Sequence, residues 1–529
     1  MNPSNSKFWL FLGLLLILNI AIFFTSPNKT FFTGEDFQWL NKVHVETLNL
    51  EEVLFYRPLL QFYFLTAFKK LELPYFYYHL INHFLHLIVC ILVMIFIYKL
   101  TKNRLISFLC AAIFGLHYMN TNVVFTIRRI DEIMAVFFML CCLILILNYI
   151  EKKNKACLIW AVFLTIIAFF ARETSVVLPL LILILLLFYD QRILRKKLIL
   201  SLPFFLIMST FLIIRLVLCS NSLALENERL SVLIAENFLR LPLLSIGLKL
   251  LFIPFQFQGK GVEFLMMRHH DVFLMWLIVL GYFFLVYIIK DKHYRFSLLW
   301  IGITLLPALY YPDPIIREKY LYIPLIGVGF LWSLFFTDIG KVLKFKKALF
   351  CLLAAMFLIL SFKSRIKRGR DFIEVSKTVK SMVDSLETIV ISNPRTVVYV
   401  VNHPYNINQF AAFPGSCAYL FLYIKKTSRY DSWCQLPIFI NIEFDSEKII
   451  PLERIEEFVA YIKQPKNVEF SKKELKEIAF KGVAFFYPDD EIILGIDSRF
   501  PSFWRRYMFY FDSDKSRFID VSLLVNNDS

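Results

Sequence analysis

Charged residues are scarce in this chain of 529 residues: they make up 19% of the sequence, while hydrophobic residues make up 58%. An ordinary soluble domain carries about 25% charged residues, so this composition excludes a soluble enzyme. The same numbers exclude a disordered chain, which is poor in hydrophobic residues, and a small secreted domain held together by disulfides. The mean hydropathy of +0.61 indicates a polytopic α-helical membrane protein.

Acidic residues are outnumbered by basic ones, 42 against 58, which gives a formal net charge of +16. Such a charge can indicate a nucleic-acid partner. Here, however, Lys and Arg cluster in short loops between apolar runs, as they do in cytoplasmic membrane loops. We therefore predict a lipid bilayer as the surroundings and no nucleic-acid partner. The basic loops are residues 102–104, 152–155, 192–197, 290–295 and 341–347.

The apolar runs predict the membrane spans, since a spanning helix needs about 20 mostly apolar residues. The run at 8–25 follows Lys7 without a small-residue cleavage site after it, so we predict an uncleaved anchor. About eleven spans result if residues 237–257 do not cross. The later runs begin near Phe76, Leu105, Ile133, Ala156, Ser175, Leu198, Val272, Phe296, Tyr320 and Ala348.

The basic loops also predict the orientation. All of them lie on the cytoplasmic side if the N-terminus is cytoplasmic and residues 220–271, an amphipathic outer segment, stay outside. A span at 237–257 would reverse everything downstream. The basic cluster at 363–370 runs against the rule, because this topology places it outside.

The composition changes after the last span. We divide the chain into a membrane domain at 1–362 and a soluble α/β domain at 363–529, outside the cytoplasm. Cys417 and Cys434 lie in this second domain. If the domain is extracytoplasmic we hypothesise that they pair, and the alternative is two buried free thiols. The predicted elements are helices at 371–390 and 452–462, and strands at 396–401, 437–442 and 484–487.

Polar residues gather on the outer side of the predicted spans. A charge at the bilayer centre costs about 2.5–3.5 kcal/mol, so we interpret these residues as the lining of an aqueous cavity. The alternative is that span ends are polar in any membrane protein. The set comprises Glu35, Asp36, Arg57, His79, Asn82, His83, His86, His117, Arg128, Arg129, Asp131, Glu132, Arg172, Glu173, Arg268, His269, His270, Asp271, Arg317, Glu318 and Lys319.

The long outer loop at 26–75 holds two adjacent carboxylates, Glu35 and Asp36. A carboxylate whose pKa is tuned by burial or by neighbouring charge can act as a general base. Adjacent carboxylates on a loop are equally compatible with simple solvation.

Four polar residues recur at helical spacing in YFYYHLINHFLHL: His79, Asn82, His83 and His86 share one helix face. The spacing of His79 and His83 suits zinc, but no acidic or cysteine partner accompanies them, so we predict no metal. Hydrogen bonding between helices and the lining of a substrate cavity are the two interpretations that we favour.

Arginines at the outer span ends suit phosphate recognition, because a guanidinium binds phosphate in a bidentate, charge-assisted way. The alternative is anchoring at the membrane interface, against which the positive-inside rule argues for arginines on the outer face. The basic residues concerned are Arg128, Arg129, Arg172, Arg268, Arg317 and Lys319.

Several motifs follow one another in a fixed order along residues 1–362: the acidic pair, YRPL, YHLINHFLH, LHYMNTNVVFTIRRID, ARETSVVLP and REKYLYIP. In this order they resemble the integral-membrane glycosyltransferases of the GT-C superfamily. The resemblance is closest to the protein O-mannosyltransferase branch, including its tetratricopeptide-linked members and bacterial relatives. It implies a GT-C-like fold and an enzyme that moves a sugar from a polyprenyl-phosphate donor to an acceptor on the non-cytoplasmic face.

The resemblance also implies roles for single residues. Asp36, with Glu35 beside it, matches the catalytic carboxylate. Arg at 172 stands where the family has Lys, and Lys at 319 where it has Arg, so charge is kept while geometry changes. Donor-phosphate binding falls to Arg129, Arg172, Lys319 and Arg317; the supporting or cavity residues are Asp131, Glu173, Glu318, Tyr320, His79, Asn82, His86, His117 and Arg57.

The implied mechanism has Asp36 deprotonate or orient an acceptor hydroxyl, while basic residues stabilise the leaving phosphate. It needs no nucleotide, and we predict no cofactor. The acceptor (protein, lipid or glycan) stays open, because no tetratricopeptide repeat follows the membrane domain. We expect a bacterial inner membrane, with the site facing the periplasm or exterior. Two alternatives remain: a surface-polysaccharide polymerase or ligase, and a lipid-linked transporter or flippase, which more often shows internal repeats.

Overall fold

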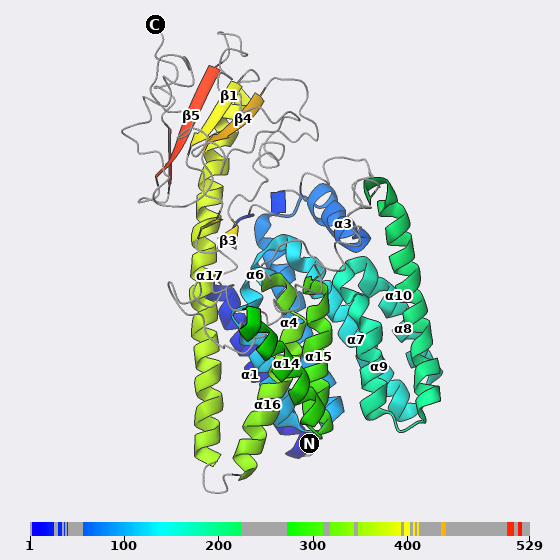
Figure 1. The fold of residues 1–529 in the computed structure, drawn as a ribbon. Coiled ribbons are helices and arrows are strands. Elements are labelled where there is room, and N and C mark those ends of the chain that lie inside the picture. Colours follow the sequence, from blue (N-terminus) through cyan, green and yellow to red (C-terminus); the bar gives the residue numbers. More distant parts are fainter. Residues whose placement is uncertain are drawn as a thin grey trace. The chain divides into compact units, whose positions relative to one another are not determined.

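The computed structural model describes residues 3–25, 30–33, 36–37, 40, 57–223, 272–309, 318–342 and 347–392, together with six strands beyond them. These residues fall into two compact units (Figure 1). The first unit comprises 1–28, 48–63 and 76–370, and the second comprises 29–47, 64–75 and 371–529. Each unit is described by itself. The domain boundary predicted at 362/363 stays a prediction.

Helices make up the described part of the first unit, and every apolar run predicted from the sequence falls on one of them. The α-helices are α1 (Pro3–Thr25), α3 (Pro58–Phe64), α4 (Tyr75–Thr101), α5 (Arg104–Leu116), α6 (Asn120–Phe125), α7 (Ile130–Lys152), α8 (Lys155–Ala171), α9 (Leu178–Tyr189), α10 (Leu194–Leu223), α14 (Val272–Ile288), α15 (Lys292–Leu309), α16 (Pro324–Val342) and α17 (Lys347–Ser392). Short 3-10 or π segments are η3 (Leu65–Lys70), η4 (Ile127–Arg129), η5 (Glu173–Val177) and η7 (Glu318–Leu321).

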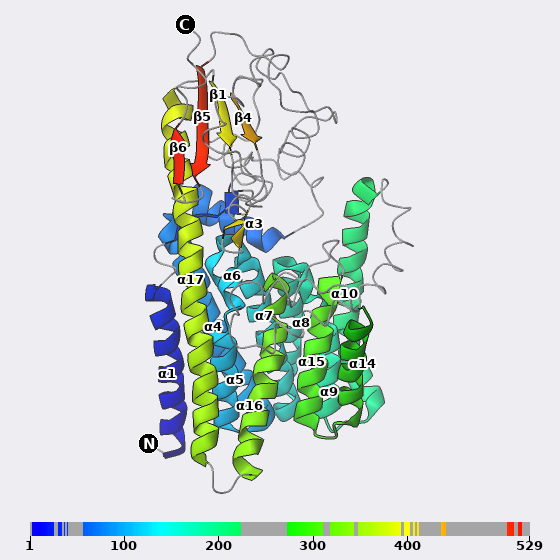
Figure 2. The same ribbon diagram turned by 60° about the vertical axis from the view of Figure 1, so that its left-hand side comes forward.

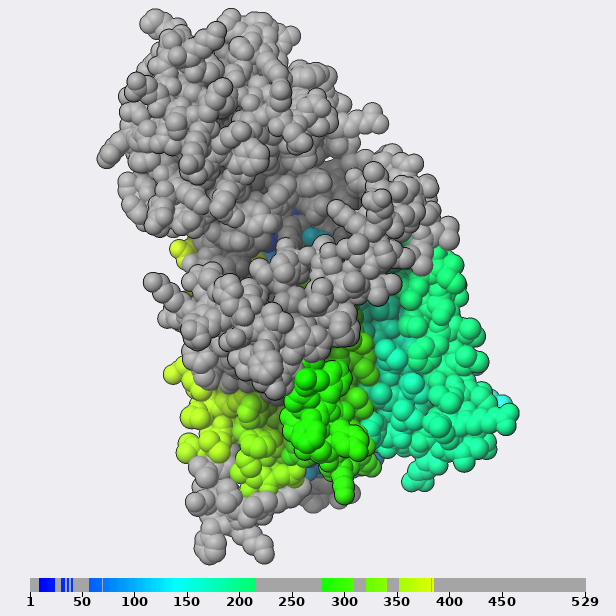
Figure 3. All heavy atoms as spheres, in the orientation of Figure 1, coloured from blue at the N-terminus to red at the C-terminus, as the bar shows by residue number. Residues whose placement is uncertain are grey.

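Three described helical stretches, at 75–101, 127–152 and 194–215, are long and apolar enough to cross a membrane. With the overall composition, they identify a helical membrane protein. The number of spans stays a prediction. The outer face of the first unit is apolar as well: side chains of α10 and α14 lie on the surface in Figure 3, and Leu206, Ile213, Phe283 and Phe284 are among the exposed large hydrophobic residues.

Two connections between helices share the sequence Lys-Asn. Lys102 and Lys153 adopt left-handed backbone angles, with φ of 53° and 55°, which ends α4 and α7. Asn103 and Asn154 then accept hydrogen bonds from the first backbone N–H groups of α5 and α8. These caps turn the chain back within two residues, and α7 and α8 pack against each other.

Four of the predicted basic loops meet at one end of the first unit. Lys99 and Lys102 pair with Glu151, at 3.1 and 2.6 Å, which joins the loops at 102–104 and 152–155. Arg192 donates to the Tyr149 hydroxyl. Tyr189 hydrogen-bonds to His293, which adds the loop at 290–295, and Tyr294 donates to Asp338 near the end of α16. The four loops at 102–104, 152–155, 192–197 and 290–295 therefore lie at one end of the first unit. The loop at 341–347 lies largely outside the described residues, and the side of the membrane stays a prediction.

Two glycines of α16 allow this helix to pack closely against α5 and α15. A Cβ atom added at Gly329 would lie 2.9 Å from the backbone oxygen of Cys110 in α5. One added at Gly327 would lie 2.8 Å from Trp300 in α15, and the Ser297 hydroxyl donates to the Gly327 carbonyl. A side chain at Gly329 would meet the backbone of α5, and one at Gly327 would meet the side chains of Trp300 and Ile301, so glycine fits both positions.

The second unit contains a four-stranded sheet in the order β4-β1-β5-β6, visible in Figure 2. β1 runs parallel to β4 and β5, and β6 pairs antiparallel with β5. The predicted strand at 396–401 coincides with β1, and that at 437–442 overlaps β4. The strands are β1 (Thr396–Val401), β2 (Asn406–Ile407), β3 (Phe410–Ala411), β4 (Gln435–Ile440), β5 (Arg505–Asp512) and β6 (Arg517–Asp520).

The predicted last span and the predicted helix at 371–390 form one continuous helix, α17. No proline interrupts the pattern between them, and α17 continues through Gly369 in the basic cluster at 363–370. Other predictions for the tail, the helix at 452–462, the strand at 484–487 and the pairing of Cys417 with Cys434, lie outside the described residues. The same holds for the amphipathic segment from residue 224 onward.

Candidate functional site

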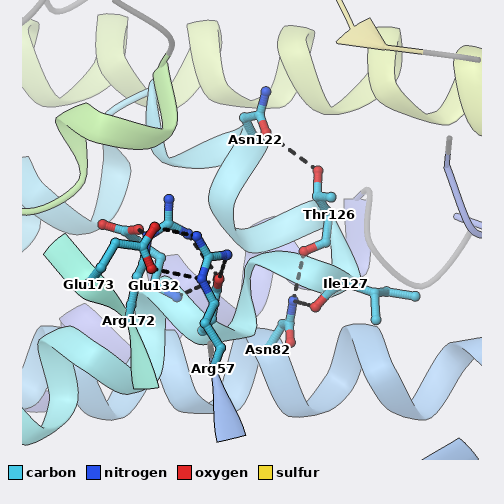
Figure 4. A network of polar contacts seen from close by, with 9 residues as sticks. Arg57, Asn82, Asn122, Thr126, Ile127, Glu132, Arg172 and Glu173 are labelled. Carbon is cyan, nitrogen blue, oxygen red and sulfur yellow. Dashed lines mark hydrogen bonds and ion pairs between the residues drawn. The ribbon is translucent and has the colours of Figure 1, made fainter. Parts of the chain in front are cut away.

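A cluster of ion pairs forms where three distant stretches of the first unit meet (Figure 4). Arg57 precedes α3, Asp131 and Glu132 lie in the first turn of α7, and Arg172 and Glu173 join α8 to η5. These are the stretches that carry the YRPL, RRIDE and RET motifs. We call these five residues the ionic cluster.

Arg57 is the centre of the ionic cluster. Its Nη1 donates to Asp131 Oδ2 at 2.5 Å, its Nε donates to Glu173 Oε2 at 2.8 Å, and Nη2 pairs with the other oxygen of Glu173. Arg57 therefore grips Glu173 with the bidentate geometry in which arginine binds carboxylates most strongly.

Arg172 closes the ionic cluster from the other side. Its Nη1 donates to Asp131 Oδ1 at 3.0 Å, and its guanidinium also pairs with Glu132. The two oxygens of Asp131 are thus shared between two arginines. Two guanidinium groups face three carboxylates, so the positive charge of Arg172 is already offset by its neighbours.

Burial makes the ionic cluster costly to build. The side chains of Arg57, Asp131 and Arg172 are 3%, 0% and 1% exposed. Desolvating such charges costs several kcal/mol for each ion, which the attraction between them repays only with excellent geometry. Burial by itself lowers the pKa of Arg57, but Glu173 and Asp131 outweigh it and raise the pKa above its ordinary value.

Local structure explains why the charges sit where they do. The partial positive charge at a helix N-terminus stabilises carboxylates, and Asp131 and Glu132 occupy the first turn of α7. Arg172 follows the last residue of α8 and has extended backbone angles, with φ −160° and ψ 142°. Its side chain therefore does not continue the helical arrangement of the α8 side chains. Pro179, at the start of α9, fits the first turn of a new helix.

Arg129, which we predicted to bind phosphate, caps α7 and is buried. It interacts electrostatically with Asp131 and Glu132, so it adds positive charge to the edge of the ionic cluster. Neighbouring Arg128 also acts on Asp131. The structure thus brings Arg57, Arg129, Asp131 and the Arg172–Glu173 pair into one place.

The polar face of α4 is buried and bonded to other segments. Asn82 donates to the carbonyl of Thr126 at 3.0 Å, His83 donates to the carbonyl of Asn19 in α1 at 2.7 Å, and His86 forms a 2.7 Å hydrogen bond with the Tyr322 hydroxyl. Hydrogen bonding between segments, one of the two interpretations of this face, is therefore confirmed for these three residues.

The remaining predicted residues of this region are buried too. His79 is fully buried on α4, and His117 follows α5, where its Nδ1 accepts from the backbone N–H of Met119. Among the residues that the structure describes, no group of three or more His, Cys, Asp or Glu is arranged to hold a metal ion.

Asp36 belongs to the second unit. It is fully buried, and its Oδ2 accepts from both the backbone N–H and the hydroxyl of Thr33, at 2.9 and 3.1 Å. Two donors on one oxygen fix the orientation of the carboxylate. The rings of Phe31, Phe32 and Phe37 pack beside it in the same short segment.

Other predicted residues are placed only in part. Glu318, Lys319 and Tyr320 lie in η7, and the Tyr320 side chain is buried. Glu35 and Arg317 lie outside the described residues, as do Arg268, His269, His270 and Asp271.

Sequence reasoning missed two buried arginines, Arg365 and Arg368. Arg365 of α17 is fully buried in the first unit and donates to the backbone carbonyl of Gly115. The signal for it was present: the basic cluster at 363–370 broke the positive-inside rule. Arg365 and Arg368 are buried while Arg370 is exposed, so the cluster does not act as a topology signal alone.

Comparison with known proteins adds little to this description. No protein-family model matches the chain, and no curated protein is similar to it. The chain is similar to a solved structure, the crystal structure of ArnT from Cupriavidus metallidurans in the apo state. The two share 13% identity and a TM-score of 0.43 over 87% of this chain and 91% of the other. Values this low decide neither the fold family nor the function.

Proposed function

We propose that this protein is a membrane glycosyltransferase that moves a sugar from a polyprenyl-phosphate donor to an acceptor hydroxyl on the non-cytoplasmic side of a membrane. One observation carries the proposal: motifs that lie far apart in the sequence supply the residues of the ionic cluster. Arg57 lies 74 residues from Asp131 and 116 residues from Glu173. The resemblance to GT-C enzymes rests on the order of those same motifs.

Buried charge favours an enzyme over a scaffold. A cluster of this kind is weak evidence for stability, because apolar residues of similar size often stabilise a protein as well or better. Charged residues within membrane segments mark functional sites by default. A protein that only presented a tail domain would have no need to hold Arg57, Asp131 and Arg172 away from water.

In the proposed reaction the acceptor oxygen attacks the anomeric carbon of the donor. The bond between that carbon and the phosphate oxygen breaks, polyprenyl phosphate leaves with the electron pair, and the acceptor proton passes to Asp36. Arg129 and Lys319 would stabilise the negative charge that develops on the departing phosphate. Arg317, Glu318 and Tyr320 would complete the donor site, with Glu35 beside the base.

The contacts of Arg172 give it a more specific role in this proposal. Because Asp131 and Glu132 already offset its charge, it can meet a phosphate only by exchanging one of those carboxylates. We propose that Arg172 and Arg57 hold Asp131 and Glu173 in position, and that Arg172 contacts the phosphate after such an exchange. His79, Asn82, His86 and His117 would support the cavity wall.

The direct test incubates the purified full-length protein with radiolabelled polyprenyl-phosphate sugars and membrane extract as a source of acceptors. We expect labelled sugar to appear covalently on an acceptor. Label that crosses a vesicle membrane without forming a new covalent product would instead identify a transporter, and the proposal would fail.

Asp36→Asn tests the base. Loss of a general base lowers rates by about 10²–10⁴-fold, so we expect transfer to fall by about 10²-fold or more. The asparagine oxygen can still accept both bonds from Thr33, so the thermal unfolding temperature should stay close to that of the parent. Glu72→Gln, at an exposed position of the same unit, is the matched control and should keep full transfer. Equal rates in Asp36→Asn and the parent would remove the assignment.

A further inference from the structure

Arg365 occupies an unusual position in the first unit. It projects from α17, is fully buried, and donates through Nη1 to the backbone carbonyl of Gly115. Its other donor atoms, Nε and Nη2, are buried and have no hydrogen-bond partner among the residues that the structure describes. These two N–H groups lie on the same edge of the guanidinium, the edge with which arginine binds a two-oxygen anion in a bidentate way.

The charge of Arg365 also lacks a counter-ion. Within the described part of the chain, carboxylates pair with Arg57 and Arg172, but no ion pair joins a carboxylate to Arg365. One hydrogen bond to a neutral carbonyl does not offset a desolvated charge, and an uncompensated buried charge strongly destabilises a fold. A methionine at this position would fill similar space without that cost.

Polar groups from two other segments lie within electrostatic reach of Arg365. It acts electrostatically on His83 and His86 of α4 and on Tyr322, which follows η7. The Tyr322 hydroxyl and His86 Nδ1 are already hydrogen-bonded to each other. A guanidinium edge, a phenol and an imidazole therefore converge from helices that lie far apart in the sequence.

The same helix presents positive charge outward as well. Lys363 and Arg370 are exposed on either side of Arg365, and basic residues beside a membrane helix attract the phosphate groups of lipids. Arg368, one turn after Arg365, lies over the ring of Tyr118 at 5.6 Å. The outward charges favour a phosphate-bearing ligand over a carboxylate.

We propose that Arg365, together with Tyr322 and His86, forms a binding site for a phosphate group. Arg365 supplies two parallel N–H donors, and the Tyr322 hydroxyl supplies a third donor once it turns from His86. Because Arg365 is fully buried, the ligand enters after neighbouring side chains move. The proposal does not rest on glycosyl transfer: the site can bind phosphate in a protein that proves to be a transporter.

The test follows thermal unfolding of the purified full-length protein in phosphate-free detergent while inorganic phosphate is titrated. A ligand that binds only the folded state raises the unfolding temperature with its concentration. We expect such a rise for the parent protein. Arg365→Met should weaken the apparent affinity at least about tenfold, as expected for loss of a charged hydrogen-bonding partner. Arg195→Met, which removes an exposed charge from α10 that plays no part in the proposed site, should respond like the parent.

The behaviour without phosphate separates this proposal from a structural role. If Arg365 serves the ligand, Arg365→Met should unfold at the same or a higher temperature than the parent in phosphate-free buffer. If it serves as a tether to the Gly115 carbonyl, Arg365→Met should unfold at a lower temperature, and its remaining response to phosphate should equal that of the parent. That second pattern would overturn the proposal.

Arg365→Lys keeps the positive charge, and it serves as the test variant if Arg365→Met does not fold. A single ammonium cannot reproduce the bidentate edge, so its response to phosphate should lie below that of the parent. Equal responses would count against the proposal.

Two further comparisons show whether the bound phosphate belongs to a lipid headgroup or is the free ion. Nanodiscs that contain phosphatidic acid are compared with nanodiscs of phosphatidylcholine alone, and inorganic phosphate is compared with acetate. A rise with phosphatidic acid that Arg365→Met abolishes assigns a lipid headgroup, and one with inorganic phosphate alone assigns the free ion. A parent protein that responds to neither, or more strongly to acetate, would overturn the proposal.

Discussion

Helix α7 carries acidic residues at both ends, and the two ends treat them in opposite ways. Asp131 lies in the first turn, fully buried between Arg57 and Arg172. Glu151 lies about 30 Å away at the other end, 37% exposed, where it pairs with Lys99 and Lys102. The two clusters have similar chemistry, so burial is the variable that distinguishes them.

The comparison shows which charged residues of α7 cost free energy to bury. Exposed ion pairs contribute about 0–1 kcal/mol because water and salt screen them. Buried pairs lose hydration, and breaking one leaves a stranded charge. Substitutions at the exposed end of α7, around Glu151, should therefore cost little stability. The buried ion pairs around Asp131 contribute neither to solubility nor to membrane orientation, so those two needs do not explain them.

The largest effect should come from Arg172→Met at the buried end. Asp131 and Glu132 then lose the guanidinium of Arg172 but stay buried. We therefore expect a loss of about 3–5 kcal/mol in unfolding free energy. Arg195→Met, an exposed arginine at the basic end, is the control and should change stability by less than about 0.5 kcal/mol. Denaturant unfolding in detergent measures both variants. If the two variants lose similar amounts of unfolding free energy, burial does not distinguish the two ends of α7.

A smaller effect should come from Asn82→Ala, which removes a buried but uncharged contact. Asn82 donates to the carbonyls of Thr126 and Ile127 at 3.0 and 3.4 Å. Leaving buried carbonyls without a donor costs about 1–3 kcal/mol. Asn82→Asp should destabilise the protein further, since a carboxylate places negative charge against the same oxygens. An aspartate variant as stable as the parent would show that this end of the bundle is wetter than its burial indicates.

The smallest effect should come from Glu151→Gln at the exposed end. We expect at most about 1 kcal/mol of destabilisation, and the difference from the parent should shrink as ionic strength rises, because salt screens exposed charges. Unfolding at low and high salt measures this. A large loss that persists at high salt would place Glu151 in the same class as Asp131.

The sequence predicted the helices better than the contacts between them. Apolar runs located the helices because burial in a bilayer demands long apolar stretches, and the basic loops predicted one shared end because they follow a general rule. The spacing of Asn82, His83 and His86 correctly placed them on one face. Their partners, such as Asn19, could not be predicted, since helix packing decides which segments meet.

The ionic cluster illustrates the same limit. Its motifs were recognised, but a pattern of charges does not reveal that Arg57 neutralises Glu173 or that Arg172 is occupied by Asp131 and Glu132. Arg365 was missed because a basic residue in a basic stretch resembles an interface anchor. Only its inward direction on α17, which depends on the rotation of that helix, distinguishes it.

The glycines of α16 constrain how α5, α15 and α16 pack together. With no side chain at Gly327 and Gly329, α16 packs closely against side chains of α15 and against the backbone of α5. A side chain added at Gly327 or Gly329 would therefore push these three helices apart.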